Sequence, residues 1–446
     1  MFGFFLYKTT KKEYDKGCSP KTNSTFQTGR KITMKKFLSV LLVLCMVLGL
    51  TACTKEEQPA DTSKTDAKPA IKIGMICIGD ENEGYSANHI NGLVKGAEEL
   101  GISKDQITFK YNIPETEAAY EAAVDLAEQG CNIIFANSFG HESYIAQAAG
   151  EYPQIEFCHA TGTSAMNAGL KNFHNYFAAI YEARYVSGVV AGMKLNEMIE
   201  AGKITAEQAK MGYVGAFPFA EVISGYTSFY LGARSVCPSV TMEVRYTNSW
   251  GDMALEKETA EALIADGCVL ISQHADTTGA PTACEAAGVP CVGYNISMIP
   301  AAPNSALTSS AVNWAAYYGY ALKNVQAGTT FPADWSAGYV DGAVAITELN
   351  PKTVPAGTAE KVAEVEAALK AGTLKVFDVS TFTAPAGAGY TVDAEGHLTS
   401  AFATDTDGDW VADANEVVAN GYFSESSVQS APYFAIIIVG ISAVTE

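Results

Sequence analysis

Short apolar runs alternate with amphipathic helical patterns in two successive blocks, residues 71–160 and 211–294, and this alternation constrains the fold most. In the first block, the run Ile71–Ile78 precedes apolar residues that recur at helical spacing from Ile90 to Leu100. Nearly continuous apolar strands between amphipathic helices are typical of parallel sheets covered on both faces. The sequence therefore predicts an α/β protein with two doubly wound parallel-sheet lobes joined by a hinge.

The individual elements follow this alternation through both blocks. Strands are predicted at Ile71–Ile78, Gln106–Ile113, Cys131–Ala136, Ile155–Ala160, Met211–Ala216, Thr241–Thr247, Cys268–Gln273 and Pro290–Tyr294. Helices are predicted at 90–100, Glu115–Gln129, His141–Glu151, Tyr181–Ile199, Glu221–Val236, Asp252–Ala265 and Pro281–Ala287. Gly or Pro follows most of these helical patterns, as expected where a helix ends.

The two blocks define the domain organisation. We assign residues 70–180 with about 297–330 to an N-terminal lobe, and 181–296 with about 331–350 to a C-terminal lobe. Residues 351–446 are expected to form a C-terminal extension.

Residues 34–52 have the features of an export signal. Two lysines precede an apolar run from Phe37 to Leu50, which is too short to span a bilayer but suits a signal-peptide core. The run ends in Leu-Thr-Ala-Cys, which resembles a bacterial lipobox, so Cys53 is the expected lipidation site. An ordinary secretory cleavage site near Ala52 is the alternative. The sequence thus predicts a lipid-anchored protein on the extracytoplasmic face of the cell membrane.

The segments on either side of this signal are expected to carry no fold. Residues 53–69 are polar and lack apolar periodicity, which is typical of a flexible tether. Residues 1–33 are interpreted as a mis-assigned upstream segment, with a long signal n-region as the alternative.

The charge distribution argues against one class of partner. Of 29 Lys and Arg and 49 Asp and Glu, nine and two respectively lie in residues 1–52, which leaves 20 basic against 47 acidic side chains from Cys53 onward. Nucleic-acid binding depends on neutralising phosphates with basic residues. A chain this acidic from Cys53 onward is therefore not expected to bind nucleic acid.

A ligand site is expected where the predicted strands end. In doubly wound sheets, ligands bind beyond the carboxyl ends of the strands, and two facing lobes bring these segments to one cleft. Aromatic and polar side chains follow several strands: Phe139, Phe217, Phe219, Trp250, Glu221, Asp252, His274, Asp276 and Asn295. This combination suits a flat ligand held by stacking and hydrogen bonds.

Several of these segments resemble the basic membrane protein family, the solute-binding lipoproteins of purine and nucleoside ABC importers. The similarity spans roughly residues 70–350. It is carried by Gly84-Tyr85, Asn137-Ser138-Phe139-Gly140, Phe157-Cys158-His159-Ala160-Thr161-Gly162, Tyr181-Glu182-Ala183-Arg184-Tyr185, Asn248-Ser249-Trp250, Gln273-His274-Ala275-Asp276 and Gly293-Tyr294-Asn295.

The resemblance implies a clamp like the type I periplasmic binding proteins, acting as the receptor of an importer. It implies partners of two kinds, an ABC permease and a separate ATPase subunit, and suits a monomer. Taken together, the strand-end pattern and the resemblance give ten candidate ligand-binding residues: Tyr85, Phe139, Tyr181, Glu182, Phe217, Glu221, Trp250, His274, Asp276 and Asn295. The resemblance implies that Tyr85, Phe139 and Trp250 would stack on the ligand and that Asp276 and Asn295 would hydrogen-bond it. Glu182 and Arg184 lie in the segment entering the second lobe, and either could serve the hinge instead.

The motifs favour a free purine base, of the adenine type, over a nucleoside. Nucleoside-binding members commonly have Asp where this chain has Asn295, and no acidic residue among Asp80, Glu81 and Glu83 has a clear register for gripping ribose. A nucleoside, a flavin or a sugar-like ligand remains an alternative, as does a sensor with the same clamp.

The sequence does not predict an enzyme. It contains no P-loop, H-E-x-x-H or G-x-S-x-G motif, so ATP hydrolysis would belong to another subunit. The cysteines from Cys77 onward are scattered and lack C-x-x-C pairs, which favours buried apolar roles over disulfides or zinc.

An acidic segment near the C-terminus is a candidate calcium loop. Residues 405–416 place acidic side chains at positions 1, 3, 5, 9 and 12, the spacing of calcium loops, although Trp410 replaces the usual glycine. The candidate ligands are Asp405, Asp407, Asp409, Asp413 and Glu416. An acidic surface turn is the alternative, and no other cofactor is expected.

Overall fold

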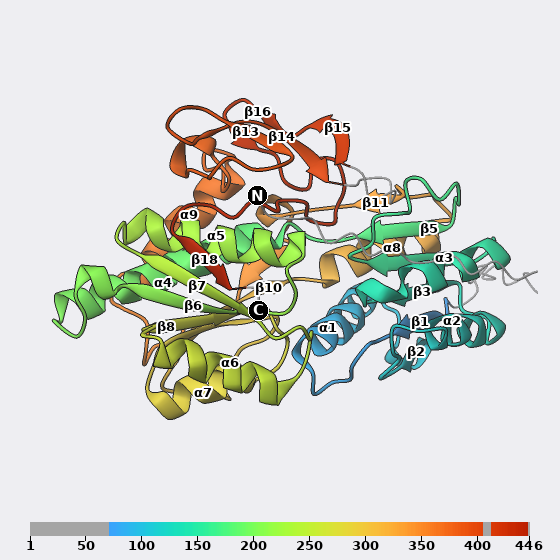
Figure 1. Ribbon diagram of the computed structural model, residues 1–446. Coiled ribbons are helices and arrows are strands. Elements are labelled where there is room, and N and C mark those ends of the chain that lie inside the picture. The colour runs from blue at the N-terminus through green and yellow to red at the C-terminus, as the bar shows by residue number, and fades with distance from the viewer. Residues whose placement is uncertain (1–70, 405–411, 445–446) are drawn as a thin grey trace, which may run out of the picture. The chain divides into compact units, whose positions relative to one another are not determined.

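The computed structural model describes residues 71–404 and 412–444 (Figure 1). The predicted upstream segment, signal peptide, Cys53 and tether lie outside the described residues. So do Asp405, Asp407 and Asp409 of the candidate calcium loop.

The first lobe is built on a six-stranded sheet with the order β11-β5-β4-β3-β1-β2, in which every pairing is parallel. Its strands are β1 (Ile73–Ile76), β2 (Ile107–Lys110), β3 (Ile133–Ala136), β4 (Glu156–Ala160), β5 (Phe173–Tyr176) and β11 (Asp334–Trp335). Its helices are α1 (Gly84–Glu99), α2 (Ala118–Glu128), α3 (Glu142–Glu151) and α8 (Ala315–Ala327).

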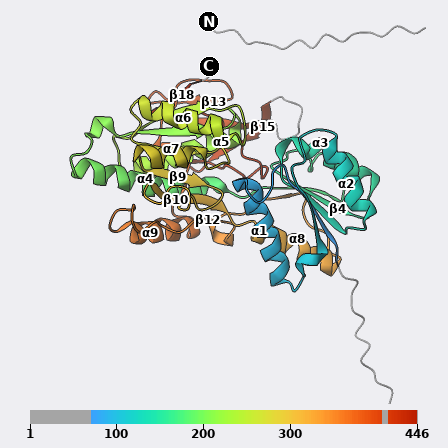
Figure 2. The same cartoon turned by 90° about the horizontal axis from the view of Figure 1, so that it is seen from below.

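These helices cover both faces of the first sheet, because alternate residues of its strands are apolar on both sides. Met75 belongs to the core formed with α1 and α8, whereas its neighbour Ile76 belongs to the core formed with α2 and α3. Figure 2 shows α1 and α8 on one side of this sheet and α2 and α3 on the other.

The second lobe repeats this topology in a seven-stranded sheet with the order β12-β10-β9-β8-β6-β7-β18, parallel except for the β10–β12 pair. Its strands are β6 (Lys210–Gly215), β7 (Thr241–Tyr246), β8 (Leu270–Gln273), β9 (Cys291–Tyr294), β10 (Ala306–Val312), β12 (Val344–Ile346) and β18 (Ile441–Val444). Its helices are α4 (Ile180–Glu200), α5 (Ala220–Val236), α6 (Met253–Ala265) and α7 (Gly279–Ala287). The predicted α/β architecture with two parallel sheets is therefore confirmed.

Helices α4 and α5 pack with their backbones in close approach because glycines line their contact. A Cβ atom on Gly188 would lie 2.0 Å from the Phe229 carbonyl oxygen, and one on Gly232 would lie 2.0 Å from that of Tyr185. Only glycine fits at such positions, so this helix pair has little room for side-chain substitution.

The chain passes between the two sheets after β5, after β10 and after β11. The first and last of these connections run side by side: Phe177 N donates to Trp335 O at 3.1 Å, and Ala179 N donates to Ala337 O at 2.9 Å. Paired connections of this kind form a hinge, because a few backbone torsions can change while both sheets stay intact.

The boundary predicted for residues 297–330 differs from the structure. Strand β10 lies in the second sheet, beside β9, whereas α8 packs on α1 in the first lobe. The following segment, predicted for the second lobe, first adds β11 to the edge of the first sheet and only then returns as β12. Strand β10 could not be recognised from its sequence, Ala-Leu-Thr-Ser-Ser-Ala-Val, because hydroxyl side chains interrupt the apolar pattern.

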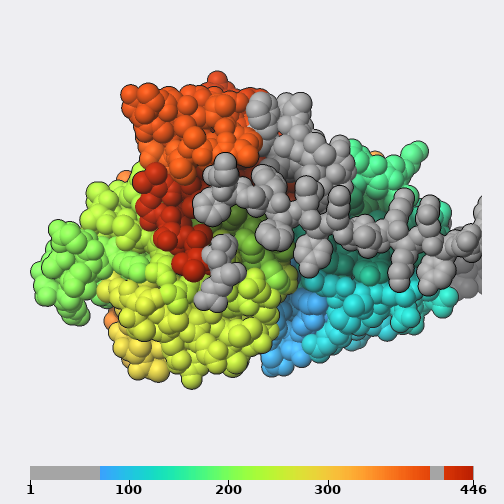
Figure 3. Space-filling model, in the orientation of Figure 1, coloured from blue at the N-terminus to red at the C-terminus, as the bar shows by residue number. Residues whose placement is uncertain are grey.

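The C-terminal extension packs on the second lobe. It contains α9 (Thr358–Lys370), the sheet of β13 (Tyr390–Val392), β14 (Leu398–Thr404) and β15 (Ala412–Glu416), and the pair β16 (Val418–Ala419) and β17 (Tyr422–Phe423). Its last strand, β18, pairs in parallel with β7, and Figure 3 shows this final segment in red between the orange extension and the yellow-green second lobe.

Two sequence expectations concern the described residues as a whole. The cysteines between Cys77 and Cys291 are all buried and unpaired, as predicted for small apolar core residues. Within residues 71–404 and 412–444, no helix has the length and apolar character needed to cross a membrane.

Candidate ligand-binding cleft

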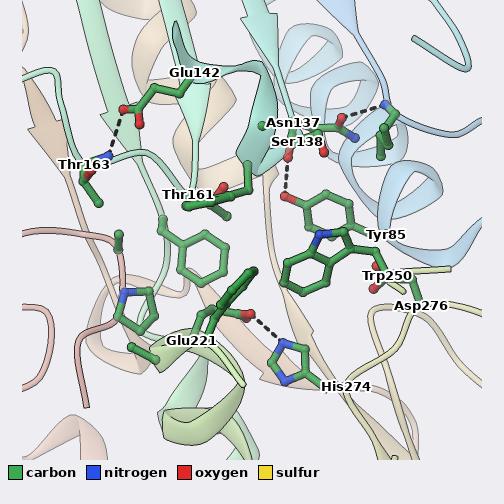
Figure 4. Close-up of a pocket in the computed structure, with 18 of the residues that line it drawn as sticks. Tyr85, Asn137, Ser138, Glu142, Thr161, Thr163, Glu221, Trp250, His274 and Asp276 are labelled. Atoms are coloured by element: carbon green, nitrogen blue, oxygen red, sulfur yellow. Dashed lines mark hydrogen bonds and ion pairs between the residues drawn. The ribbon is translucent and has the colours of Figure 1, made fainter. Parts of the chain in front are cut away.

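A cavity of about 720 Å³ lies between the two lobes, at the ends of their strands (Figure 4). Its volume falls within the range of about 300–1,000 Å³ that small-molecule sites occupy. Both lobes and the C-terminal extension line it. Of the predicted ligand-binding residues, six lie in its wall: Tyr85, Phe139, Glu221, Trp250, His274 and Asp276.

The fold explains why these residues converge. Phe139 follows β3, Trp250 follows β7, and His274 and Asp276 follow β8. Strands β1 and β3, like β6 and β8, flank the point where the order of their sheet reverses, and ligands of open α/β sheets bind at such points. Tyr85 comes from the first turn of α1, the next element after β1 along the chain.

The aromatic residues form a nearly continuous surface along the cleft. The Phe139 ring of the first lobe lies 5.9 Å from the Phe219 ring of the second, centroid to centroid. Phe217 stacks on Phe219 at 5.1 Å and contacts Trp250 edge-on, also at 5.1 Å. Phe139 and Phe219 are each 43% exposed, so a large apolar area remains for a ligand to cover.

A buried charged network supports the second-lobe wall. Arg184 donates through Nη1 to the Gln273 carbonyl at 2.6 Å, lies 3.6 Å from the Tyr294 ring centroid, and approaches His274 Nδ1 through Nη2 at 3.3 Å. Because a guanidinium only donates, His274 Nδ1 accepts, and its Nε2–H donates to Glu221 Oε2 at 2.7 Å. Burial lowers the pKa of His274, which favours this neutral tautomer.

Asp276 is a buried carboxyl among other acidic groups. Its Oδ1 accepts from Asn295 Nδ2 at 2.7 Å. Burial raises the pKa of Asp276 well above its usual value, and the carboxylates of Glu83, Glu256 and Glu221 raise it further. The raised pKa shifts the equilibrium of Asp276 toward its protonated form, and a protonated carboxyl can both donate and accept a hydrogen bond at the edge of a ligand.

Hydrogen bonds hold the side chains and the loop of the first-lobe wall in place. Tyr85 Oη donates to the Asn137 carbonyl at 2.6 Å, which fixes the tyrosine ring beside the cavity. Glu142 accepts from the backbone N–H groups of Thr163 and Ser164 at 2.8 and 2.9 Å, so its charge positions the loop after β4.

The remaining predicted ligand-binding residues lie outside the cavity wall. Asn295 holds Asp276, and Phe217 supports the rings of Phe219 and Trp250. Tyr181 packs on Phe377 of the extension, with ring centroids 5.3 Å apart. Glu182 accepts from Tyr339 N at 2.6 Å, which places it at the hinge, as the sequence analysis allowed.

Sequence reasoning did not single out several residues of the wall. Among them are Ser143, Phe177, Gln429 and Ala435, whereas Tyr294 belongs to a segment quoted for the family resemblance. Phe177 lies in the hinge after β5, a strand whose sequence Phe-His-Asn-Tyr is too polar to be recognised. The segment Ser430–Phe434, in an aromatic and apolar tail, is predicted from sequence to dock on the body of the protein, but nothing in it predicts contact with a ligand.

The calcium prediction stays a prediction. Asp413 belongs to β15, and the Glu416 carboxylate accepts hydrogen bonds from Ala401 N at 3.0 Å and Val418 N at 3.1 Å. In the part of the chain that the structure describes, no group of three or more His, Cys, Asp or Glu side chains could hold a metal ion.

Two lobes with parallel sheets, a paired hinge and a cavity between them define a solute-binding clamp. Solved structures share this fold: a solute-binding protein of an ABC transporter from Aeropyrum pernix K1 matches with a TM-score of 0.58 at 18% identity, over 71% of this chain and 94% of that one. Another from Conexibacter woesei matches with a TM-score of 0.56 at 19% identity, over 69% and 98%.

A family assignment is possible because residues 70–373 match the family described as ABC transporter substrate-binding protein PnrA-like (Bmp). The chain belongs to this family and is the ligand-binding component of an ABC transporter, a class of binding proteins and not of enzymes. Membership implies an extracytoplasmic location.

Two curated relatives differ in the ligand that their names give. A purine-binding protein of Brucella abortus is 33% identical over 313 residues, which cover 70% of this chain and 84% of the relative. A putative ABC transporter glucose-binding protein of Haloferax volcanii is 32% identical over 256 residues, which cover 57% of this chain and 61% of the relative.

Proposed function

We propose that this protein binds a purine nucleobase in the cleft between its lobes and delivers it to the permease of an ABC importer. The observation that carries this proposal is the aromatic surface of Phe139, Phe219 and Trp250 with the Asp276 carboxyl in the same cavity. Flat heterocycles bind by stacking on such rings, and a carboxyl matches the adjacent donors and acceptors of a purine edge.

The relatives support a purine without fixing it. The relative from Brucella abortus is named as purine-binding and aligns over most of both chains. The relative from Haloferax volcanii is named as glucose-binding, and this favours a sugar-like ligand as the second candidate. Aromatic rings also stack on sugars, so the two candidates differ mainly in how much of the ligand is flat and apolar.

Ligand binding is expected to stabilise the closed clamp. Gly84 N of the first lobe donates to the Asp276 carbonyl of the second at 3.2 Å, so the lobes already contact each other at the cavity. A ligand that contacts Tyr85 on one lobe and Trp250 on the other would add contacts that exist only in this arrangement. Differential contacts of this kind shift a hinge equilibrium toward closure.

A thermal-shift screen of the full chain in detergent tests the ligand. The panel is adenine, guanine, hypoxanthine, xanthine, uric acid, their nucleosides, riboflavin and glucose. We expect adenine to raise the melting temperature most, because a ligand of the folded form stabilises it by about 2.7 kcal/mol at a hundred times its dissociation constant. A shift with glucose alone, or with nucleosides alone, would replace the nucleobase by that ligand.

We further propose that a lipid on Cys53 anchors this receptor, as a monomer, beside the permease and its ATPase subunit. The observation behind this is the apolar signal segment ending in Leu-Thr-Ala-Cys. Cys53→Ser should release the protein from the membrane fraction into the medium or periplasm, and labelled fatty acid should no longer be incorporated. Continued membrane retention of Cys53→Ser would contradict the lipid anchor.

A further inference from the structure

The C-terminal extension supplies part of the cleft wall. Gln429, Ala431, Pro432 and Ala435 line the same cavity as Trp250. They lie beyond residue 373, where the match to the family ends. The wall is thus composed of two lobes of the family fold and one segment that the family match does not include.

Hydrogen bonds and ring stacking fix this segment against both lobes. Ser430 donates through its backbone N and its Oγ to the Asp334 carboxylate, at 2.6 and 2.5 Å, and Asp334 belongs to β11 of the first sheet. Phe434 is fully buried and stacks on Phe377 at 4.3 Å. On the other side of Gln429, Glu425 accepts from Ser224 Oγ of α5 at 2.6 Å.

Gln429 is the polar side chain of this segment in the cavity wall. It is only 4% exposed, and its Oε1 has no hydrogen-bond partner among the described residues. A buried acceptor without a partner costs about 1–3 kcal/mol, so such an atom is expected to be satisfied in the functional state of the protein. Gln429 lines the cavity while its Oε1 is itself buried, so a donor on a bound ligand reaches Oε1 when the side-chain amide turns toward the cavity.

We propose that Gln429 is a ligand-binding residue whose Oε1 accepts a hydrogen bond from an N–H group on the ligand. With Ala431 and Pro432 at its side, it gives the extension a direct part in selecting the ligand. The proposal rests on the proposed function in taking that ligand to be a purine base, whose ring and exocyclic nitrogens carry such N–H groups.

Titration calorimetry of the full chain with adenine tests this assignment. Gln429→Met keeps the length of the side chain but removes the acceptor, and we expect adenine to bind about three- to tenfold more weakly, as for one lost hydrogen bond. The matched control is Gln147→Met on an exposed position of α3, which should bind adenine as the unchanged protein does.

The melting temperature of the ligand-free variant separates binding from structure. Removing an unpaired buried acceptor should leave the unliganded protein as stable as before, or more stable, whereas loss of a structural hydrogen bond would lower its melting temperature. If Gln429→Met failed to fold, Gln429→Leu would be measured in the same way.

Methylated ligands identify the donor. N6,N6-dimethyladenine and 9-methyladenine remove the exocyclic and the ring N–H groups respectively. The ligand that lacks the donor to Gln429 should bind the unchanged protein and Gln429→Met equally, because the paired interaction is already absent.

The outcomes distinguish this inference from the proposed function. Adenine binding with equal affinity to the unchanged protein and to both Gln429 variants would overturn the role of Gln429 and leave the nucleobase receptor standing. If no purine bound the unchanged protein, the nucleobase proposal would fail. The unchanged protein and the Gln429 variants would then be titrated with glucose and riboflavin. If neither ligand bound, or if the variants bound as the unchanged protein does, the role of Gln429 would be overturned too.

Discussion

Trp250→Ala is expected to weaken adenine binding by roughly 5- to 150-fold, which corresponds to the 1–3 kcal/mol that base stacking on an aromatic side chain contributes. Trp250 presents an indole ring to the cavity, and the ring is held in place by Phe217 at 5.1 Å. Its carbonyl also accepts from Asp276 N at 2.9 Å, so the stacking surface and the carboxyl are parts of one loop arrangement. Titration calorimetry measures the loss directly.

Two further variants serve as controls for the Trp250→Ala measurement. Trp250→Phe retains an aromatic face and should recover most of the affinity, whereas Tyr120→Ala, which removes a ring on α2 outside the cavity, should leave affinity unchanged. Adenine binding that is the same for Trp250→Ala and the unchanged protein would refute the assignment of the cleft.

Glu256→Gln is expected to stabilise the protein increasingly as the pH rises from about 5 to 8. Glu256 is fully buried in α6, and both its oxygens accept from Thr277 N at 3.1 Å. Burial raises the pKa of Glu256 to about 7, and the nearby carboxylates of Glu83 and Asp252 contribute. No basic side chain is among the groups that shift it.

The direction of this pH effect follows from the numbers of protons bound by the folded and the unfolded protein. A carboxyl whose pKa is raised on folding contributes stability that is present below its unfolded pKa of about 4.5 and is lost as the pH rises through about 7. Gln cannot ionise, so the variant avoids this loss, which amounts to about 3 kcal/mol at most. Urea unfolding at pH 5 and pH 8 measures the difference between variant and unchanged protein.

The stability of the variant must be compared with that of the unchanged protein at each pH, because other buried groups also titrate between about pH 5 and pH 8. Burial lowers the pKa of His89, His141, His159 and His274, and these residues make the protein more stable as pH rises. Glu258→Gln, on an exposed position of the same helix, is the matched control for removing one carboxylate from α6. An identical result for Glu256→Gln would contradict the prediction.

The regular parts of the fold could be predicted because their side chains are apolar in a simple pattern. Strand β1 and helix α6 both lie where the sequence places them, and Asp252, at the predicted start of α6, caps the helix by accepting from Ala254 N and Leu255 N. Strand β5 could not be recognised, since it contains His174 and Asn175, two polar residues buried through hydrogen bonds to Glu156 and to the Ala165 backbone. Such partners depend on distant segments that no local pattern reveals.

The candidate site, too, could be predicted from sequence only in its local features. The end of a parallel strand is a local feature, so Trp250, His274 and Asp276 could be placed near a cleft from sequence alone. Whether a side chain faces the cavity or supports a neighbour depends on three-dimensional packing, and this is why Asn295 and Phe217 were grouped with the lining residues. Gln429 could not be found, because the contacts that bring the extension to the cleft, such as those of Ser430 with Asp334 and of Glu425 with Ser224, join segments far apart in the sequence.

The pairing of β18 with β7 has a consequence for biosynthesis. Strand β7 is an edge strand of its sheet until β18 is made, and β18 is synthesised only after the remaining strands of the second lobe and the rest of the extension. During export the β7 backbone would present unpaired N–H and C=O groups, which are prone to pair with other chains. Secretion chaperones that shield nascent strands are therefore expected to matter more for this receptor than for a clamp whose sheet is completed early.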